Sequence, residues 1–195
     1  YEDVTNVDSV GLITARSGIN VTGGDVGIGL TNPEDYGNFA DDLVIYDSSQ
    51  PGMTFASGTS GYGSIYFADG TVGNAASRGQ IQYGHSDDYM AFATAASEAL
   101  RIDSSGRLLL GTTTEGEAAA DNLTIADSGS CGITIRSGTS NNGNIFFSDT
   151  TSGTGEFDGF IQYQQNNRAL RFATATTERL RIDSSGDIDL SIAAA

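Results

Sequence analysis

The turn at residues 84–88, Gly-His-Ser-Asp-Asp, holds the residue types of a hydrolytic triad, and His85 is the only histidine of the chain. A histidine near a serine and an aspartate could act as the general base of a nucleophilic hydrolysis. Such groups must, however, meet in space beside an oxyanion hole, and adjacent turn residues rarely do so. Gln165 occupies the position of His85 in a second copy of the segment. We therefore predict no catalytic role for His85.

Cys131 is the only cysteine, so no intrachain disulfide framework exists and the redox compartment stays open. A catalytic cysteine needs a neighbouring histidine or another group that lowers the pKa of its thiol. Cys131 instead lies in a Ser- and Gly-rich turn without a nearby histidine, and Pro51 stands at the equivalent position of the first copy. We predict a weakly buried thiol without a catalytic role.

The 25 Asp and Glu residues could supply two other kinds of chemistry. A glycosidase needs two carboxyl groups about 5–9.5 Å apart, a distance that the sequence alone leaves open. A calcium loop needs spaced ligands such as D-x-D-x-D-G, and neither the Asp-Ser-Ser-Gly turns nor Asp41-Asp42 matches that pattern. We predict that the chain is not an enzyme, and that it has no catalytic residue, no cofactor and no metal site.

Tyr62 and Tyr89 lie close to predicted turns, where aromatic rings could stack on sugars. Their counterparts in the second copy are Asn142 and Ala169, neither of which is aromatic. We therefore interpret the two tyrosines as surface residues rather than as a sugar-binding platform.

Most of these residues lie within an internal repeat. The segment EALRIDSSGRLLLGTT at 98–113 returns as ERLRIDSSGDIDL at 178–190, and a shorter relative, INVTGGDVGIGLT, lies at 19–31. Residues 41–110 align without a gap on residues 121–190, a shift of 80 positions. This period exceeds the 20 to 50 residues of solenoid repeats, so each copy is predicted to be a small domain.

Each copy is predicted to form short β-strands, because its apolar and polar residues alternate with a period of two. Ser104-Ser105-Gly106 separates two alternating segments, which predicts a β-hairpin. The strands predicted in the first copy cover residues 43–46, 53–57, 63–68, 79–84, 89–94, 98–103 and 107–112, and the second copy repeats them 80 positions later. The side chains expected on the inward, dry face are Leu43, Ile45, Met53, Phe55, Ile65, Phe67, Ile81, Tyr83, Met90, Phe92, Leu100, Ile102, Leu108 and Leu110.

The composition predicts an all-β chain of tandem small antiparallel modules. The chain has 26 glycines and only two prolines, and it offers no sustained apolar stripe with the 3.6-residue helical period. The predicted divisions are the end of a preceding β unit with a hairpin at 1–33, a connector at 34–40, a first module at 41–114, a connector at 115–120, a second module at 121–192 and a tail at 193–195. Within the first division, a strand is expected around Val10–Ala15.

The formal net charge of -16 argues against two classes of partner. Every positive charge is an arginine, and the excess of carboxylates repels nucleic acid and anionic membrane surfaces. No run of about 18 apolar residues occurs, so we predict no membrane insertion. The simplest interpretation of the acidity is solubility and resistance to nonspecific association.

Several segments resemble a known class of protein. The segments ALRIDSSGRLLLGTT, ERLRIDSSG, VGIGLTNP at 26–33 and GFIQYQQNNRALRFAT are similar to the repeating β-rich modules of tail-fibre and related virion proteins of tailed bacteriophages, especially marine ones. Strings of the type LRIDSSGNVGIGTTSP recur between the β-rich units of those proteins. The likeness runs from about Val10 to Leu190.

This resemblance implies an elongated, intertwined homotrimeric fibre segment on the extracellular virion. Its partners would be other virion tail proteins and a bacterial surface glycan or protein receptor. A glycan-cleaving tailspike and a cellular extracellular filament or adhesin remain the alternatives. No virion anchor or receptor-binding tip is visible, so we expect a shaft piece or a chain whose ends are missing.

The predicted strands also indicate that the chain associates with copies of itself. Fourteen inward side chains are few for 70 residues, and an open sheet leaves strand edges that invite pairing. We therefore predict a parallel homotrimer with the hairpins at 98–113 and 178–192 near the contacts between chains. On this basis Ile102→Asp should prevent assembly. Leu109→Asp, which copies Asp189, should not.

Overall fold

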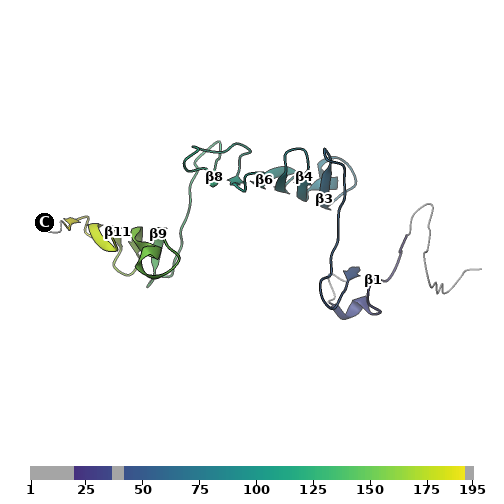
Figure 1. The fold of residues 1–195 in the computed structure, drawn as a ribbon, viewed down its shortest axis with the longest axis horizontal. Coiled ribbons are helices and arrows are strands. Elements are labelled where there is room, and N and C mark those ends of the chain that lie inside the picture. Colours follow the sequence, from purple (N-terminus) through teal and green to yellow (C-terminus); the bar gives the residue numbers. More distant parts are fainter. Residues whose placement is uncertain (1–19, 37–41, 192–195) are drawn as a thin grey trace, which may run out of the picture. The chain divides into compact units, whose positions relative to one another are not determined.

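The computed structural model of the chain describes residues 20–36 and 42–191. These residues form thirteen β-strands and three short 3-10 helices, with no α-helix among them (Figure 1). The prediction of an all-β chain is confirmed. The strands belong to three sheets of two, six and five strands. The chain divides into two compact units between residues 96 and 97. This boundary falls inside the six-stranded sheet.

The two-stranded sheet joins β1 (Val26–Ile28) in parallel to β2 (Leu43–Ile45), and the 3-10 helix η1 (Pro33–Tyr36) lies between them in the chain. The hairpin predicted within residues 1–33 is not formed in the described part. Residues 20–25 contain no strand, and β1 pairs with β2 instead. The strand expected at Val10–Ala15 lies outside the described residues.

The six-stranded sheet has the order β3-β4-β5-β6-β7-β8. β4 pairs antiparallel with both β3 and β5, and β6 pairs antiparallel with β7, whereas β8 joins β7 in parallel. The strands are β3 (Tyr62–Phe67), β4 (Gly79–Gly84), β5 (Tyr89–Thr94), β6 (Ser97–Ile102), β7 (Leu108–Leu110) and β8 (Leu123–Ile125), with the 3-10 helix η2 (Gly73–Ser77) between β3 and β4.

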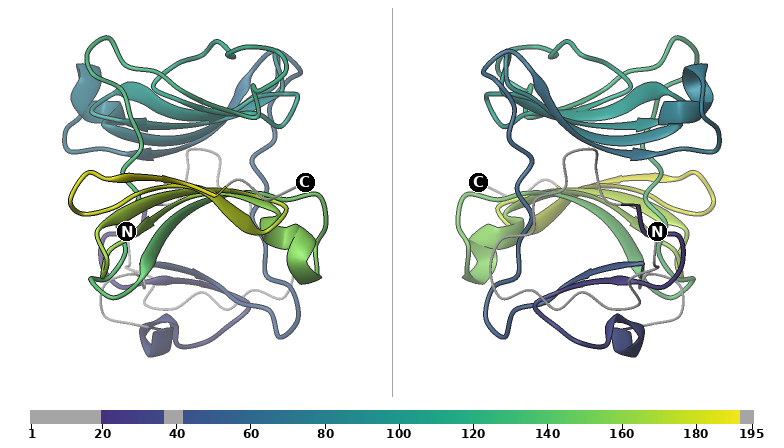
Figure 2. Two further views of the ribbon diagram at one scale, coloured as in Figure 1. Left: turned by 90° about the vertical axis from the view of Figure 1, so that its left-hand side faces the viewer. Right: turned by 90° about the vertical axis from the view of Figure 1, so that its right-hand side faces the viewer.

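The five-stranded sheet repeats β3 to β7 in the order β13-β12-β11-β10-β9, with antiparallel pairs throughout. Figure 2 shows the two larger sheets as single curved layers, each with a short 3-10 helix beside it. The strands are β9 (Asn142–Phe147), β10 (Gly159–Gln164), β11 (Ala169–Thr174), β12 (Thr177–Ile182) and β13 (Ile188–Leu190), and the 3-10 helix is η3 (Gly153–Phe157).

The Asp-Ser-Ser-Gly segments form the predicted hairpin turns. One carboxylate oxygen of Asp103 accepts hydrogen bonds from the backbone N–H groups of Ser105 and Arg107, at 2.9 and 3.0 Å. Asp183 makes the same two bonds in the second copy, at 2.8 and 3.0 Å. The backbone hydrogen bond from Arg107 is the main reason why the pKa of Asp103 is lowered. The aspartate therefore closes each turn locally, as short polar side chains do in turns.

The strands predicted at 53–57 and 133–137 are not formed. Alternating residues are present there, but a strand also needs a neighbour for its backbone N–H and C=O groups. The first segment instead lies against β3 at Gly63. A Cβ built on Gly63 would lie 3.6 Å from the Cβ and the carbonyl oxygen of Phe55. The second copy crosses in the same way, with Ile135 against Gly143.

The predicted dry face is not buried within a single chain. None of its fourteen side chains falls in the buried class, and Phe67 is 58% exposed. The buried apolar side chains of the described strands stand on the opposite face, at Val44, Ala91, Leu109, Phe160, Ala169 and Ala173. Alternation thus identified the two faces, but the face covered within the chain is the other one.

Leu109 shows why the opposite face is buried. Its side chain is 1% exposed, and it shares its face with Arg107, two residues away, and with Thr124 on β8. The connector after β7 is attached to both neighbours: Arg107 binds Asp121 at 2.9 Å, and the N–H of Gly116 donates to the Thr124 hydroxyl at 2.9 Å. The connector therefore covers Leu109. This burial argues against the prediction that Leu109→Asp leaves assembly intact, because Asp189, at the equivalent position, is exposed.

Candidate functional site

The strand register aligns the apolar residues of each sheet into rows. In the six-stranded sheet Ile81 of β4 lies opposite both Ile65 of β3 and Phe92 of β5. Leu110 of β7 is paired in the same way with Leu100 of β6 and Ile125 of β8. Side chains directly opposite one another on one face of a sheet are in contact. The face is therefore a continuous apolar surface rather than a set of isolated side chains.

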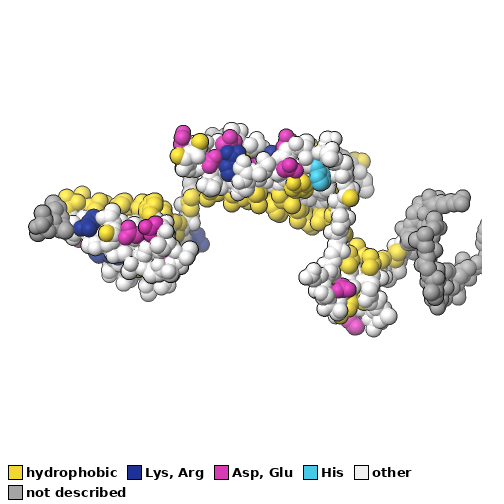
Figure 3. Space-filling model, viewed as in Figure 1, with side chains coloured by type: hydrophobic (Ala, Val, Ile, Leu, Met, Phe, Trp, Pro, Cys, Tyr) yellow, Lys and Arg dark blue, Asp and Glu magenta, His cyan; other side chains and the backbone are white. Residues whose placement is uncertain are grey.

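The five-stranded sheet carries an equivalent row from edge to edge. Its members, in strand order from β9 to β13, are Ile145, Ile161, Phe172, Leu180 and Leu190. Ile145 is 48% exposed and Leu190 is 67% exposed. Figure 3 shows hydrophobic side chains gathered along one side of each of the two larger sheets. We call these two surfaces the apolar faces.

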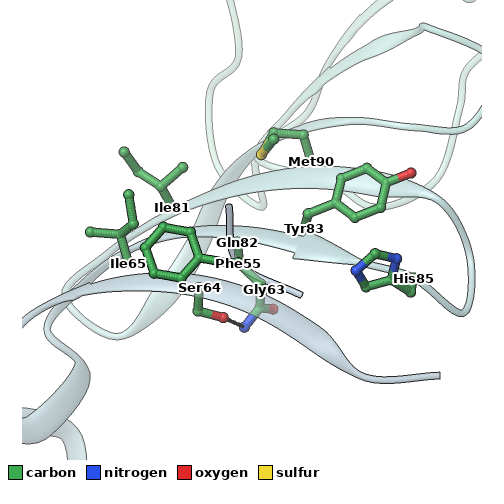
Figure 4. A pocket seen from close by; sticks show the side chains of 9 residues that line it. All are labelled: Phe55, Gly63, Ser64, Ile65, Ile81, Gln82, Tyr83, His85 and Met90. Carbon is green, nitrogen blue, oxygen red and sulfur yellow. Dashed lines mark hydrogen bonds between the residues drawn. The ribbon is translucent and has the colours of Figure 1, made fainter. Parts of the chain in front are cut away.

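A shallow apolar groove lies on the first apolar face, where the crossing segment passes over β3. Figure 4 shows its lining: Phe55, Gly63, Ser64, Ile65, Ile81, Gln82, Tyr83, His85 and Met90. Beneath the apolar side chains, the amide nitrogen of Gln82 donates to the Ser64 hydroxyl at 3.1 Å. The second copy has a groove at the equivalent residues, among them Ile135, Gly143, Ile145, Tyr163 and Leu170. Because the groove recurs, it belongs to the fold rather than to one loop.

His85 lies at the end of this groove as a packing residue. Its ring meets the Tyr83 ring edge-on, with centroids 5.0 Å apart and planes at 75°. The Tyr83 hydroxyl donates to Asp88 at 3.0 Å, and this bond raises the pKa of Tyr83. Ser86 donates to Asp87 at 3.0 Å. Within this described turn no hydrogen bond joins His85 to Ser86, so the turn is not arranged as a nucleophile with its base.

Cys131 is exposed, and its thiol donates to the carbonyl oxygen of Ile125 at 3.4 Å. It lines another shallow apolar groove together with Leu123, Ile125 and Ile133. The described part of the chain brings no histidine to this groove. The thiol therefore contributes to the edge of the apolar face, and no neighbouring base there could activate it.

The two tyrosines weighed as sugar platforms lie in different settings. Tyr62 begins β3 and is 56% exposed. Tyr89 is half-buried because its ring covers Gly84, where an added Cβ would come within 2.6 Å of the ring. Tyr89 therefore acts as a cover for a buried glycine. The two rings are not presented as a matched pair.

The faces opposite the apolar faces carry the charged groups. In the five-stranded sheet Glu178 accepts hydrogen bonds from Arg171 and Arg181, the latter at 2.7 and 2.9 Å. Arg171 also donates to Gln162 at 2.6 Å and lies over the Phe160 ring, 5.5 Å from its centroid. The bonds from Arg181 and then Arg171 lower the pKa of Glu178, although burial opposes them. The charged side chains on this side of the sheet are therefore paired with one another and only partly exposed.

The acidic residues of the described segments form no cluster with cation-binding geometry. No group of three or more His, Cys, Asp or Glu side chains in these segments is placed to hold a metal ion. Asp41, half of the Asp41-Asp42 pair, lies outside the described residues. None of the helices in the described segments has the length and apolar character needed to cross a membrane. No protein-family model and no curated protein sequence matches the chain.

Proposed function

We propose that this chain is a structural virion protein, namely a shaft or host-adhesion segment of a bacteriophage tail fibre, extracellular and without catalytic activity. The observation that supports it is the exposed apolar face present on both repeats. Contiguous exposed apolar surface on a soluble protein marks an interaction site. The Arg-Ile-Asp-Ser-Ser-Gly segments, and the wider resemblance to tail-fibre modules, favour the virion as the place where that interaction occurs.

The occupant of the apolar faces is a further copy of the same chain. Both repeats present the same rows of residues, so parallel copies aligned in register would cover both faces at once. The network around Glu178 lies on the opposite face, so contacts through the apolar faces would not cover it further. Two copies would cover the faces as a sandwich; the resemblance to fibre shafts favours three. Three-fold closure would also leave no self-complementary surface open to further chains.

Native mass measurement of the full chain tests the assembly. The expected particle is three times the 20.2 kDa chain, and a folded monomer at micromolar concentration would contradict the proposal. Ile102, which is 42% exposed on β6, remains the first position to change. We expect Ile102→Asp to prevent assembly, because a carboxylate would be buried without a partner between chains.

Strand β3 offers a matched pair of variants for the same experiment. Ile65 and Tyr66 are neighbours that are 39% and 55% exposed and point to opposite faces. In a monomer the two aspartate substitutions would have similarly small effects on stability. In the proposed trimer Ile65→Asp should abolish assembly while Tyr66→Asp leaves it intact. Equal behaviour of the two variants would show that the apolar face is not the contact surface.

The virion assignment needs a separate test, because other filaments also assemble from β-rich chains. Antibodies against this chain should label fibres on capsid-bearing particles, which carry the other tail proteins and meet the bacterial glycan or protein receptor. Labelling of cell-surface filaments instead would favour a cellular adhesin. Release of reducing sugar from host polysaccharide by the pure chain would contradict the absence of catalysis and favour a glycan-cleaving tailspike.

A further inference from the structure

Two parallel strand pairs in the chain share one pattern of hydrogen bonds. In the pair β7–β8, Leu108 N–H donates to the carbonyl of Asn122 at 2.8 Å, and Ala126 N–H donates to that of Leu110 at 2.9 Å. In β1–β2 the matching bonds run from Val26 to Asp42 at 2.9 Å and from Tyr46 to Ile28 at 2.8 Å. Each pair joins the last strand of one repeat to the first strand of the next. We call each pair a repeat joint.

Both repeat joints need a glycine directly after the first strand. Gly29 and Gly111 have φ angles of 82° and 72°, a region that glycine occupies without steric cost. A Cβ at Gly29 would lie 2.1 Å from the carbonyl oxygen of Tyr46, and one at Gly111 would lie 2.2 Å from that of Ala126. These oxygens belong to the residues that follow the second strand. A side chain at the glycine position would therefore displace the second strand.

Both repeat joints also have a buried apolar group at the middle of the first strand. In β7 this group is the side chain of Leu109, lying under the connector. In β1 the middle residue is Gly27, and the buried ring of Pro33 fills the space, 3.0 Å from a Cβ built at Gly27. The two joints thus solve one packing problem with different residues. Leu109 is itself buried, whereas Gly27 stays exposed beside the buried Pro33, so both joints place apolar groups at this position and neither places a charge there.

Strand β13 is the structural equivalent of β7 but lacks both features. Ser191 N–H donates to Arg179 at 2.9 Å as Gly111 N–H donates to Ala99 at 3.0 Å, so the two positions correspond. Serine stands there in place of glycine, and Ser191 does not share the positive φ of Gly111. Exposed Asp189 replaces buried Leu109. Burying that carboxylate under a connector would remove it from water without a new partner.

A third difference between β7 and β13, at the position of Arg107, does not determine whether a repeat joint forms. Arg107 links the hairpin turn to the connector through Asp103 and Asp121, and Asp187 replaces it before β13. The equivalent residue before β1 is Asp25, yet the β1–β2 joint is formed. An aspartate at this position is therefore compatible with a joint. The middle residue of the first strand and the glycine after it are the positions that discriminate.

We infer that the outer edge of β7 is a docking site for the first strand of a following repeat, and that β13 rejects such a strand because of Asp189 and Ser191. The partner recognised at β7 is an extended Leu-Thr-Ile segment of the same chain, preceded by its connector. On β13 the same hydrogen-bonding edge lies on the outside of the sheet, and a charged side chain on such an edge discourages pairing. This inference concerns contacts within one chain and stands independently of the proposed trimer.

Amide hydrogen exchange on the full-length chain tests the role of the two positions at β7. The double variant Leu109→Asp/Gly111→Ser gives β7 the residues of β13. Protection of the Leu108 and Ala126 amides should fall at least about tenfold, or about 1.4 kcal/mol of local opening free energy. Amides of β10 and β11, in the five-stranded sheet, serve as the internal control for folding and should keep their protection. Unchanged protection of the two joint amides would overturn the inference.

The single variant Arg107→Asp is the matched control. It removes the three ion pairs of Arg107, with Asp103, Glu115 and Asp121, but leaves Leu109 and Gly111 in place, so the two joint amides should stay within about threefold of their original protection. A loss as large as that of the double variant would show that the ion pairs, rather than the packing, make the joint.

A gain-of-function experiment covers the case in which the double variant fails to fold. A second copy of residues 112–191 is added after Ser191, once with the native residues and once with Asp189→Leu/Ser191→Gly. The Ile188 amide, the counterpart of Leu108, should become protected only in the substituted chain. Protection in the native version, or its absence from both versions, would refute the assignment of these two positions.

Discussion

The two larger sheets have apolar residues at equivalent positions on one face, whereas the residues on the other face differ between them. The apolar rows of β3–β7 and β9–β13 stay apolar at equivalent positions, for example Phe92 and Phe172. On the opposite face of the second sheet a cross-strand row consists of Asn144, Gln162, Arg171, Arg181 and Asp189. The equivalent positions of the first copy hold Ser64, Gln82, Ala91, Arg101 and Leu109.

This contrast is informative because the preserved face is the exposed one. Within one chain an exposed apolar side chain contributes little to stability, so packing inside the chain gives no reason to keep it apolar. Ile65 and Ile145, which are 39% and 48% exposed, are nevertheless the same residue. The constraint is understandable if other chains cover the face. The opposite face varies because each sheet stabilises it differently, by a covering connector in one and by ion pairs in the other.

The largest effect is expected at the position where the two sheets differ most in burial. Leu109→Asp should destabilise the first sheet by about 3 kcal/mol or more, because it removes a buried side chain and places a carboxylate under the connector. Asp189→Leu, at the exposed equivalent, should change stability by less than about 0.5 kcal/mol. Urea unfolding followed by circular dichroism measures both. Similar values for the pair would mean that the connector does not protect Leu109.

A smaller difference is expected at the two-residue turns between the third and fourth strands of the two larger sheets. The turn residues have positive φ in both sheets, with Ala96 at 62° and Thr176 at 57°. This conformation costs a side-chain-bearing residue about 1–2 kcal/mol, and it is least suited to a β-branched one. Thr176→Gly should therefore stabilise the chain by about 1 kcal/mol and Ala96→Gly by about half as much.

Thermal unfolding of the two glycine variants checks this order. The N–H of Thr176 donates to the carbonyl of Asp158 at 2.8 Å, and that of Ala96 donates to the carbonyl of Arg78 at 2.9 Å. Both backbone bonds remain in the glycine variants, so the variants alter only the side chain. Destabilisation by Thr176→Gly would indicate that the hydroxyl bond of Thr176 to Ala175, at 2.7 Å, matters more than the relief of strain.

The ion-pair network of the second sheet predicts a pH dependence. The pKa of Glu178 is lowered in the folded chain, so its contribution is fully present above the unfolded pKa of about 4.3 and is lost as the pH falls through the lower folded pKa. Because the carboxylate keeps some contact with water, at most about 1 kcal/mol is involved. The free energies of unfolding of Glu178→Gln and of the unsubstituted chain, compared at neutral and acidic pH, isolate the contribution of the ionised Glu178. A constant difference across that range would contradict it.

The smallest effects are expected where the copies differ without structural consequence. His85→Gln and Cys131→Ser should each change the free energy of unfolding by no more than about 0.5 kcal/mol. His85 packs against Tyr83, and Cys131 is exposed with one weak bond to a carbonyl. Denaturant titration measures both. A loss of several kcal/mol in either variant would show that the residue is part of an interface between chains.

Sequence patterns predicted most of the local structure. The hairpins at the Asp-Ser-Ser-Gly turns follow from short-range chemistry, because the aspartate binds N–H groups only two and four residues away. Alternation located most of the strands and sorted their side chains correctly into two faces. It missed the role of Gly111, although the glycine that follows both β1 and β7 was a visible signal of a close backbone approach.

Tertiary structure decided everything that depends on a distant neighbour. Segment 53–57 has a strand's alternation but finds no hydrogen-bonding edge, whereas β8, with only three residues, finds one on β7. Leu109 and Asp189 occupy equivalent positions, and only the connector lying over Leu109 makes that position dry. A period of two determines which side chains share a face. Burial depends on what lies against that face, and residues far away in the sequence, or in another chain, supply that cover.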